Sequence, residues 1–536
     1  MSVILGSAPR FLPARLATFG RRHAQANLSP LVRQLPIRRT VATHGSTAAR
    51  YSPLAYTLLT RTPEAITPDD VLSSLPPIPG SLTPADYVPV LFVTPAFASW
   101  IDTSSHGFLE QWINRFYPNT SKCEHTRPVD AIVAVVDRLP DHRVNTEEAI
   151  DGVCTPESEG ISLLLVNADN VRGKAAAPRR IRSMEAAESS LVFVIQNGDT
   201  RLFSKSPTHE IGLRLANTIF VNGNENTLFG TRWVYTPSHG YALDQSVNLS
   251  SCVVTSNASA VSDSFNLPLY PVGQRRRVIS SMGNILRQLA KHTDSQSSAP
   301  MPASSELEKE LPRYIAEHGI VDQRVSVWAL IEDSEDGFQM DANTNTQKSL
   351  VSSIRKGGAL HRVMSGGGGW GKKQGLLSLD PETTFLEADG RCGLLGLDDV
   401  FNNAHSPPDA PPPPPPPPSF DMPYFGDDLS ALSQAARPGD YVQFFVSLEP
   451  DHVPAREHED GSISFHFGVV SDAETVVQST DSTKKDLVVA SNYFGALSER
   501  AITYLQPMSG AESAEVVQES SAKFDIPGCR VEVVMK

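Results

Sequence analysis

The hydrophobic pattern in the first half of the chain consists of short, nearly continuous apolar runs. Three of them, Val88–Thr94, Ala131–Asp137 and Ile161–Val166, have the length of single strands. Runs of this kind usually have both faces covered, as in a sheet packed by helices. A helix built from Phe97–Trp100 and Phe108–Ile113 is expected behind the first strand. The pattern predicts a mixed α/β domain over residues 88–272.

Two turn signals predict that the later part of this domain is antiparallel. Asn197-Gly198-Asp199 separates the apolar segments 191–196 and 201–203. Asn222-Gly223-Asn224 separates 218–221 from 227–229. An Asn-Gly pair between two apolar segments is a strong hairpin signal.

Residues 273–318 are predicted to form a helical connector. Behind Arg275-Arg276-Arg277, apolar residues recur at helical spacing, and Ser304 can cap a second helix over 305–316. The apolar positions of the first helix are Ile279, Met282, Ile285, Leu286 and Leu289.

Strand patterns return in the second domain, which begins at residue 319. A strand is expected at Val325–Ile331, a helix at Gln347–Arg362 and a strand at Tyr441–Leu448. Ile463–Val469 alternates, as an antiparallel strand with one buried face does, and Val531–Met535 repeats the alternation. The second domain divides into a glycine-loop part (319–404), a poly-proline insertion (405–422) and a β-rich remainder (423–536). The predicted fold class is α+β, with an N-terminal mixed sheet with helices and a C-terminal β-rich domain.

The first fifty residues change the picture, because they hold eight arginines, no lysine and no acidic residue. Leu12, Leu16 and Phe19 can share one helical face, as in a mitochondrial presequence. We therefore expect a presequence over 1–51, a location in the mitochondrial matrix and a proline-rich extended lead-in over 52–87. A disordered basic tail is the alternative. No apolar run reaches the ~20 residues of a membrane span.

Without the first fifty residues, 38 basic residues face 60 acidic ones, a net charge of −22. So acidic a body is not expected to coat nucleic acid, and any contact with RNA must come from local patches. The five cysteines lie far apart, which predicts free thiols in the core rather than disulfides. Eight consecutive prolines, Pro411–Pro418, predict a polyproline II spacer, with an SH3 or WW ligand as the alternative.

The most unusual stretch is Ser365–Gly375, in which six of eleven residues are glycine. Consecutive glycine N–H groups can cradle an anion, lysines add charge, and tryptophan can stack on a base. The alternative is close backbone packing with Trp370 in the core. The candidate anion- or ligand-binding residues are His361, Arg362, Gly366, Gly367, Gly368, Gly369, Trp370, Gly371, Lys372 and Lys373.

This stretch resembles a phosphate-binding P-loop only in part. Lys373 stands where Ser or Thr should bind Mg²⁺, and Gln374-Gly375 with Asp380-Pro381 prevents a following helix. We therefore reject a nucleotide triphosphatase. The strand-end Asp137 is a favoured position for a functional carboxylate, but a cap or turn is its more common role. His452, His458 and His466 lack metal-ligand spacing. No catalytic residue, metal site or cofactor is predicted.

Three segments, Arg277–Leu289, Val327–Leu330 and Leu360–Pro381, resemble a family of fungal mitochondrial proteins with an S-G-G-G-G-W-G-x-K-x-G-L-L-S-L-D-P loop. The resemblance implies the compartment and supplies no catalytic residues. Leu91–Phe97, followed by a helix and Ala131–Asp137, is similar to the opening of the FIST sensory domain, which implies small-molecule binding.

The leading functional hypothesis is a non-enzymatic mitochondrial matrix protein that supports mitochondrial gene expression through this loop. Its expected partners are the mitochondrial ribosome or RNA, or a small anionic ligand. A FIST-like ligand-binding sensor and an unrecognised enzyme remain the alternatives.

Overall fold

The computed structural model describes eighteen segments of the chain, and all of them belong to the unit Ser52–Lys536. The predicted presequence lies outside them. The described ranges are 54–75, 86–102, 107–117, 128–141, 157–177, 189–197, 208–223, 226–291, 299–320, 325–334, 337–338, 346–366, 375–385, 393–404, 434–447, 462–471, 486–507 and 519–536.

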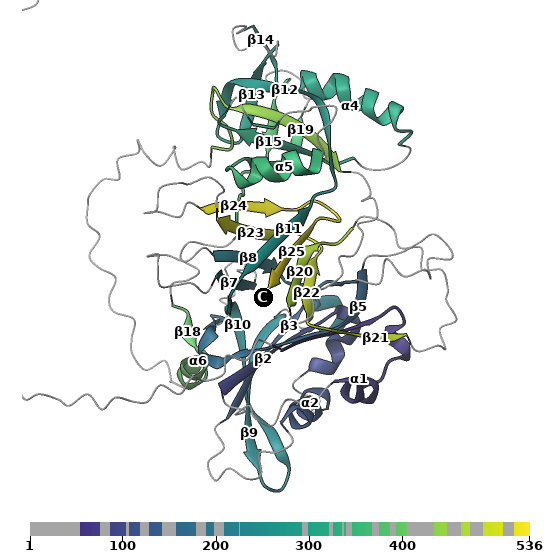
Figure 1. The fold of residues 1–536 in the computed structure, drawn as a ribbon, viewed down its shortest axis with the longest axis vertical. Coiled ribbons are helices and arrows are strands. Elements are labelled where there is room, and N and C mark those ends of the chain that lie inside the picture. Colours follow the sequence, from purple (N-terminus) through teal and green to yellow (C-terminus); the bar gives the residue numbers. More distant parts are fainter. Residues whose placement is uncertain are drawn as a thin grey trace, which may run out of the picture. The chain divides into compact units, whose positions relative to one another are not determined.

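The fold is α+β, with strands predominating over six α-helices in the described residues (Figure 1). A 14-stranded sheet runs in the order β21-β1-β5-β2-β3-β9-β10-β7-β8-β23-β24, with β4, β6 and β18 attached beside this path. Its strands are β1 (Leu54–Thr60), β2 (Tyr87–Val93), β3 (Val129–Val135), β4 (Leu139–Pro140), β5 (Glu157–Asn167), β6 (Val171–Ala175), β7 (Ser190–Asn197), β8 (Thr208–Arg214), β9 (Leu228–Thr236), β10 (Gly240–Ala258), β18 (Leu395–Gly396), β21 (Leu487–Ser491), β23 (Ile502–Pro507) and β24 (Glu519–Phe524).

Helices cover one face of this sheet, and residues of a second sheet lie in the core on its other face, so the strands are covered on both faces, though by helices on only one of them. The turn η3 (Pro95–Ile101) and helix α2 (Phe108–Phe116) join the parallel pair β2 and β3, and α2 buries Trp112, Ile113 and Phe116. Residues 52–87, expected as an extended lead-in, contain strand β1 and helix α1 (Pro68–Ser74). Strand β1 pairs with both β5 and β21. The remaining short helical elements here are η1 (Pro63–Ala65), η7 (Ala168–Asn170), α3 (Ile219–Asn222) and α6 (Leu397–Ala404).

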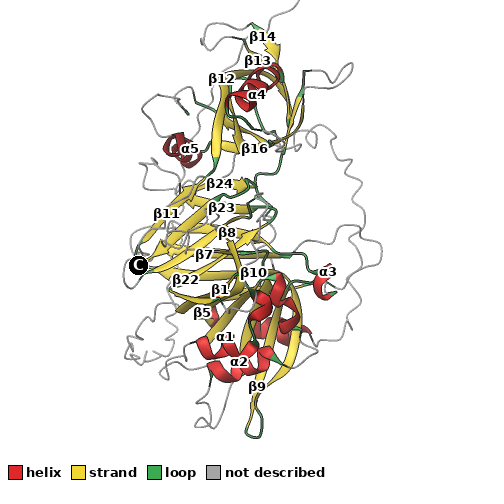
Figure 2. Cartoon of the chain, turned by 90° about the vertical axis from the view of Figure 1, so that its right-hand side faces the viewer, coloured by secondary structure: helices red, strands yellow, loops and turns green. Residues whose placement is uncertain are grey.

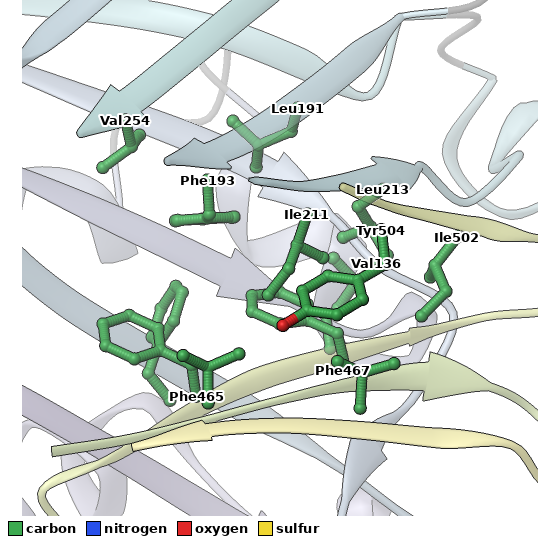
Figure 3. Close-up of a cluster of buried hydrophobic side chains, with 14 of the residues drawn as sticks. Val136, Leu191, Phe193, Ile211, Leu213, Val254, Phe465, Phe467, Ile502 and Tyr504 are labelled. Atoms are coloured by element: carbon green, nitrogen blue, oxygen red, sulfur yellow. The ribbon is translucent and has the colours of Figure 1, made fainter. Parts of the chain in front are cut away.

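A second, four-stranded sheet shares a core with the large one. Its order is β11-β25-β20-β22, formed by β11 (Val261–Asn266), β20 (Ile463–Val469), β22 (Tyr493–Ser498) and β25 (Arg530–Met535). Figure 3 shows Phe193, Ile211 and Tyr504 of the large sheet directed at Phe465 and Phe467 of the small one. All five side chains are buried. This two-sheet core is rich in aromatic rings.

The third sheet closes into a six-stranded barrel, because β12 pairs with both β19 and β13. Figure 2 shows these strands with helices α4 and α5 beside them. The barrel consists of β12 (Leu269–Met282), β13 (Ile285–Ala290), β15 (Val327–Glu332), β16 (Ala359–Gly366), β17 (Leu377–Leu379) and β19 (Tyr441–Ser447), with β14 (Pro300–Pro302) attached to β13. The helices are α4 (Ser305–Glu317) and α5 (Thr346–Arg355).

The predicted helix at the start of the connector is wrong. Residues 269–290 form the hairpin β12–β13, which turns at Gly283-Asn284, where Gly283 has φ +58°. The apolar residues with helical spacing do not share one buried face: Met282 is exposed, Ile279 is half-buried and Leu286 is buried, and the strand pairing of β12 is irregular. The second predicted helix is confirmed as α4, although the Ser304 hydroxyl donates to Glu308 (2.7 Å) rather than accepting a backbone N–H.

Three other predictions need correction. Asn222-Gly223 ends helix α3, with Gly223 at φ +75°, instead of forming a hairpin. The helix predicted over Gln347–Arg362 stops at Arg355, because Gly357 with φ +100° ends it and β16 follows. Strand β20 is parallel to β22 as well as antiparallel to β25, and it is buried on both faces except at His466 instead of on one face alone.

The other strands and the buried cysteines predicted from the sequence are found where the structure describes them, with some changes in their bounds. Strands β7 and β8 are antiparallel as predicted, although β8 begins at Thr208 and the segment 201–203 lies outside the described residues. Strand β25 alternates between half-buried and buried positions. Cys252 and Cys529 are free and buried as expected, while Cys123, Cys154 and Cys392 lie outside the described residues. The poly-proline run also lies outside them.

Candidate functional site

The glycine loop, residues Gly366–Gly375, connects the two strands of a barrel hairpin. Strands β16 and β17 are antiparallel, with Ser365 opposite Ser378 and Gly366 opposite Leu377. Residues 367–374, which include Trp370, Lys372 and Lys373, lie outside the described residues. A P-loop joins a strand to a helix, whereas this loop joins a strand to an antiparallel strand. The topology thus confirms the rejection of a P-loop.

The two glycines at the base of the loop lie close to neighbouring side chains. A Cβ atom on Gly366 would lie 2.2 Å from Leu377 Cδ2. Gly375 has φ +85°, and a Cβ atom there would lie 2.8 Å from Pro302 Cβ. The Leu377 side chain can move away from a Cβ atom at position 366, whereas the positive φ and the proline contact at position 375 require glycine.

His361 and Arg362 lie on β16 and not on a helix, so they face opposite sides of the hairpin. His361 is buried, and its Nδ1 atom lies 2.8 Å from the carbonyl oxygen of Asp380. Burial lowers the pKa of His361, so the ring adds no charge to the loop near neutral pH. Arg362 is half-buried, donates to Ser326 Oγ (3.1 Å) and lies 5.6 Å from the ring centroid of Trp328.

The segment that follows the loop is fixed by a cluster of ion pairs, which we call the stem clamp (Arg214, Asp380, Glu382 and Lys523). The Lys523 ammonium group donates to Asp380 (2.7 Å) and Glu382 (2.5 Å). Arg214 donates to Glu382 (2.9 Å). These bonds tie β17 of the barrel hairpin to β8 and β24 of the large sheet.

The charges of the stem clamp shift each other's protonation equilibria. Burial alone would raise the pKa of Asp380, but the bonds from Lys523 and from the Glu382 N–H outweigh it and lower the pKa. Burial alone would lower the pKa of Lys523, but its two carboxylate partners raise it. Asp380 and Lys523 are therefore both ionised near neutral pH. Sequence reasoning missed it, because Lys523 lies far along the chain from the loop.

Besides the stem clamp, a second group of polar side chains, His209, Tyr504, Asp263 and Arg355, forms a connected series of contacts. His209 Nδ1 on β8 lies 2.7 Å from the hydroxyl of Tyr504 on β23, and Arg355 on α5 donates to Asp263 on β11 (2.7 Å). Burial lowers the pKa of His209 and raises that of Tyr504, whose hydroxyl also interacts with Asp263. These contacts link the large sheet, the four-stranded sheet and helix α5, and we interpret them as structural.

Asp137 is buried after the end of β3, and its carboxylate accepts the backbone N–H of Glu499 (2.8 Å). Burial raises its pKa to about 6. The contact fastens β3 to the turn after β22, which agrees with the structural role expected for this residue. The described residues contain no group of three or more metal-ligating side chains.

One cleft, of about 370 Å³, lies between β12 and α4. Its charged groups already pair with one another: Arg276 with Glu306, Lys309 with Glu310, and Arg313 with Glu317. A ligand would have to compete with these pairs.

Comparisons with protein-family models, with curated proteins and with solved structures gave no match. Among the described helices, none is long and apolar enough to cross a membrane.

Proposed function

We propose that this protein supports mitochondrial gene expression by binding RNA phosphates, within the ribosome or free, through the glycine loop. The observation that carries the proposal is the position of the loop at the end of a barrel hairpin whose base is fixed by packing and by the stem clamp. Lys372 and Lys373 belong to a loop whose two ends are held by fixed strands, and a binding site needs such support from the surrounding structure.

The charge distribution supports the same proposal. Because the body of the chain is acidic, electrostatic attraction for RNA must be confined to a few positions. Glycine-rich backbone allows close approach of a phosphate, and two lysines can release two counterions. The arginine-rich segment 1–51, proposed as a presequence, would deliver the protein to the mitochondrial matrix.

The test measures binding of a fluorescent 20-nucleotide RNA to the chain lacking residues 1–51 at several salt concentrations. The Lys372→Ala/Lys373→Ala variant is expected to bind about tenfold more weakly, with a salt slope smaller by about 1–2. The matched control is Lys348→Ala/Lys356→Ala, which removes two exposed lysines, one from α5 and one directly after it, without touching the loop.

Equal RNA binding by the wild type and both variants would contradict the proposal. Sedimentation of the tagged chain in a mitochondrial lysate, with and without RNase, tests whether the protein is associated with ribosomal particles. Co-migration with ribosomal particles that RNase abolishes is the expected outcome, and migration as a free species would count against it.

A FIST-like sensor of small molecules is the second candidate, supported by the cleft between β12 and α4. Its volume of about 370 Å³ is within the range of small-ligand sites. A ligand would have to exchange with the ion pairs of its wall, among which those of Lys309 and Arg313 are the most exposed. A metabolite that co-purifies with the wild type, but not with a Lys309→Ala/Arg313→Ala variant, would favour this reading.

A further inference from the structure

The cleft between β12 and α4 follows one face of the helix. Five residues of β12 and six of α4 line it. The six residues of α4 lie between Glu306 and Glu317 and recur three or four positions apart, so they share one side of the helix. Figure 1 shows α4 beside β12. The cleft is therefore a groove along the helix, and helical spacing fixes the order of the charged groups in it.

The most deeply buried charged groups of the lining, Arg276 and Glu306, form the floor of the cleft. Glu306 accepts bonds from Arg276 (3.0 Å) and from the backbone N–H of Gln274 (2.8 Å). The pairing of β12 with β19 changes register between Val272 and Arg276, so the backbone between them leaves the regular ladder. Gly273, with φ +69°, lies in this bulge. The floor is therefore fixed by its own bonds and keeps its shape without a ligand.

The rim of the cleft consists of exposed charged groups of both signs. Lys309, Arg313 and Glu317 expose 78%, 66% and 55% of their side chains. Lys309 donates to Glu310 (2.6 Å) and Arg313 to Glu317 (2.8 Å). Exposed pairs of this kind contribute at most about 1 kcal/mol each. Three cationic and three anionic side chains line the cleft in total, so the lining has no net charge.

A lining without net charge favours a neutral ligand over an ion. A charged ligand meets the competition of the ion pairs in full, because it leaves one member of a pair without its partner. A hydroxyl group carries no charge and can both donate and accept. Lysine and arginine have more N–H groups, and carboxylates more lone pairs, than one ion pair uses. Several hydroxyl groups can therefore bond to both signs of charge without separating the pairs.

We propose that the cleft between β12 and α4 binds a neutral polyhydroxylated ligand of monosaccharide size. The hydroxyl groups bond to Lys309, Arg313 and Glu317 at the rim, and the C–H groups of the ligand pack on Val272 and the ring of Tyr314. The volume of about 370 Å³ is sufficient for such a ligand. The inference rests on the cleft being the site of the second candidate function, and it is independent of RNA binding by the glycine loop.

The experiment is saturation-transfer NMR on the full chain with D-glucose, D-galactose, D-ribose and myo-inositol. D-glucosamine and D-glucuronate are added as matched compounds, because they carry a positive and a negative charge on the same ring. At least one neutral compound should receive saturation from the protein, and it should bind more tightly than both charged ones. Arg313→Ala should weaken its binding about tenfold, because a hydrogen bond to a charged group is lost.

The matched control is Arg287→Ala, which removes an exposed arginine of β13 that does not line the cleft and should leave binding unchanged. Binding of glucosamine or glucuronate alone would overturn the inference and leave the cleft as a site for charged ligands. Saturation of none of the compounds would count against both the inference and the second candidate function. Equal binding of a neutral compound by the wild type and Arg313→Ala would contradict the assignment to this cleft.

Discussion

The two-sheet core and the barrel core differ in how they combine apolar and charged groups. Between the sheets, the core is held by packed phenylalanine rings, and Phe494 alone lies within 4.7–6.5 Å of four others. The barrel interior is mostly aliphatic, and its wall contains the buried carboxylates of Glu306 and Glu332. Each is paired with an arginine of β12, namely Arg276 and Arg275.

This difference gives the arginine cluster Arg275-Arg276-Arg277 a role that the sequence did not reveal. Arg275 donates to Glu332 and lies 4.4 Å from the ring centroid of Tyr441, and Arg276 donates to Glu306 and to the carbonyl oxygen of Lys291. The first two arginines therefore hold the barrel together. A basic run in sequence is not by itself a basic surface.

The largest expected effect tests the aromatic core. Phe494→Ala should lower the free energy of unfolding of the two-sheet region by about 3–5 kcal/mol, because it removes a fully buried ring and leaves a cavity. Denaturant unfolding combined with hydrogen exchange resolved by region checks this, since the barrel should keep its protection. The control is Phe385→Ala, which removes a half-buried ring that contacts Arg214. Equal losses for the two variants would contradict the distinction between the cores.

The next effect tests the barrel's dependence on charge. Glu332→Gln should destabilise the barrel by about 2–3 kcal/mol, because it removes the charge that faces Arg275 and leaves a poorly matched amide in a buried position. The carboxylate also accepts the Phe338 N–H (2.8 Å). The change is followed through the fluorescence of Trp328 on β15.

Glu317→Gln on the exposed end of α4 is the matched control, and it should leave the unfolding curve unchanged. A Glu332→Gln barrel as stable as the wild type would mean that aliphatic packing alone holds it.

The same contrast explains how much of the fold the sequence could predict. Strands β2, β3 and β5 were predicted because both of their faces are buried, so they consist of continuous apolar runs. Strands β12 and β13 are half-exposed and irregular, and their apolar residues matched a helix by coincidence. The Gly283-Asn284 pair was a hairpin signal in the sequence, and it should have outweighed the periodicity.

For the candidate site, the sequence located the loop but not its surroundings. The glycines and lysines mark the stretch by composition alone. The stem clamp depends on Lys523 and Arg214, which come from strands far away in the chain, and no local pattern encodes such a meeting. From the sequence, His361 was expected to add a charge beside the loop. Its burial depends on the position of β16 between β15 and β17, which the local sequence does not reveal.

The smallest expected effect concerns Asp137, a carboxylate of the two-sheet region. Burial is the main influence on its pKa, whereas Glu332 of the barrel is paired with an arginine. The pKa of Asp137 is raised from the usual 3.8 to about 6, first of all by burial. Well below pH 3.8 the carboxyl group is protonated in both the folded and the unfolded chain, and the folded state has no buried charge. As the pH rises from about 4 through 6, the unfolded chain loses the proton before the folded one does, and stability is lost.

Asp137→Asn removes this charge and keeps an acceptor for the Glu499 N–H. The variant should come close to the wild type at pH ~4, where the loss has only begun, and should be more stable by about 2 kcal/mol at pH 7, somewhat less than a shift of two pKa units allows. Urea unfolding of both proteins from pH 4 to 8 measures the difference. Asp137→Ala, which also removes the acceptor, should gain less at pH 7 and lose stability at pH 4. A difference between Asp137→Asn and the wild type that does not change with pH would show that the carboxylate is not destabilised by its burial.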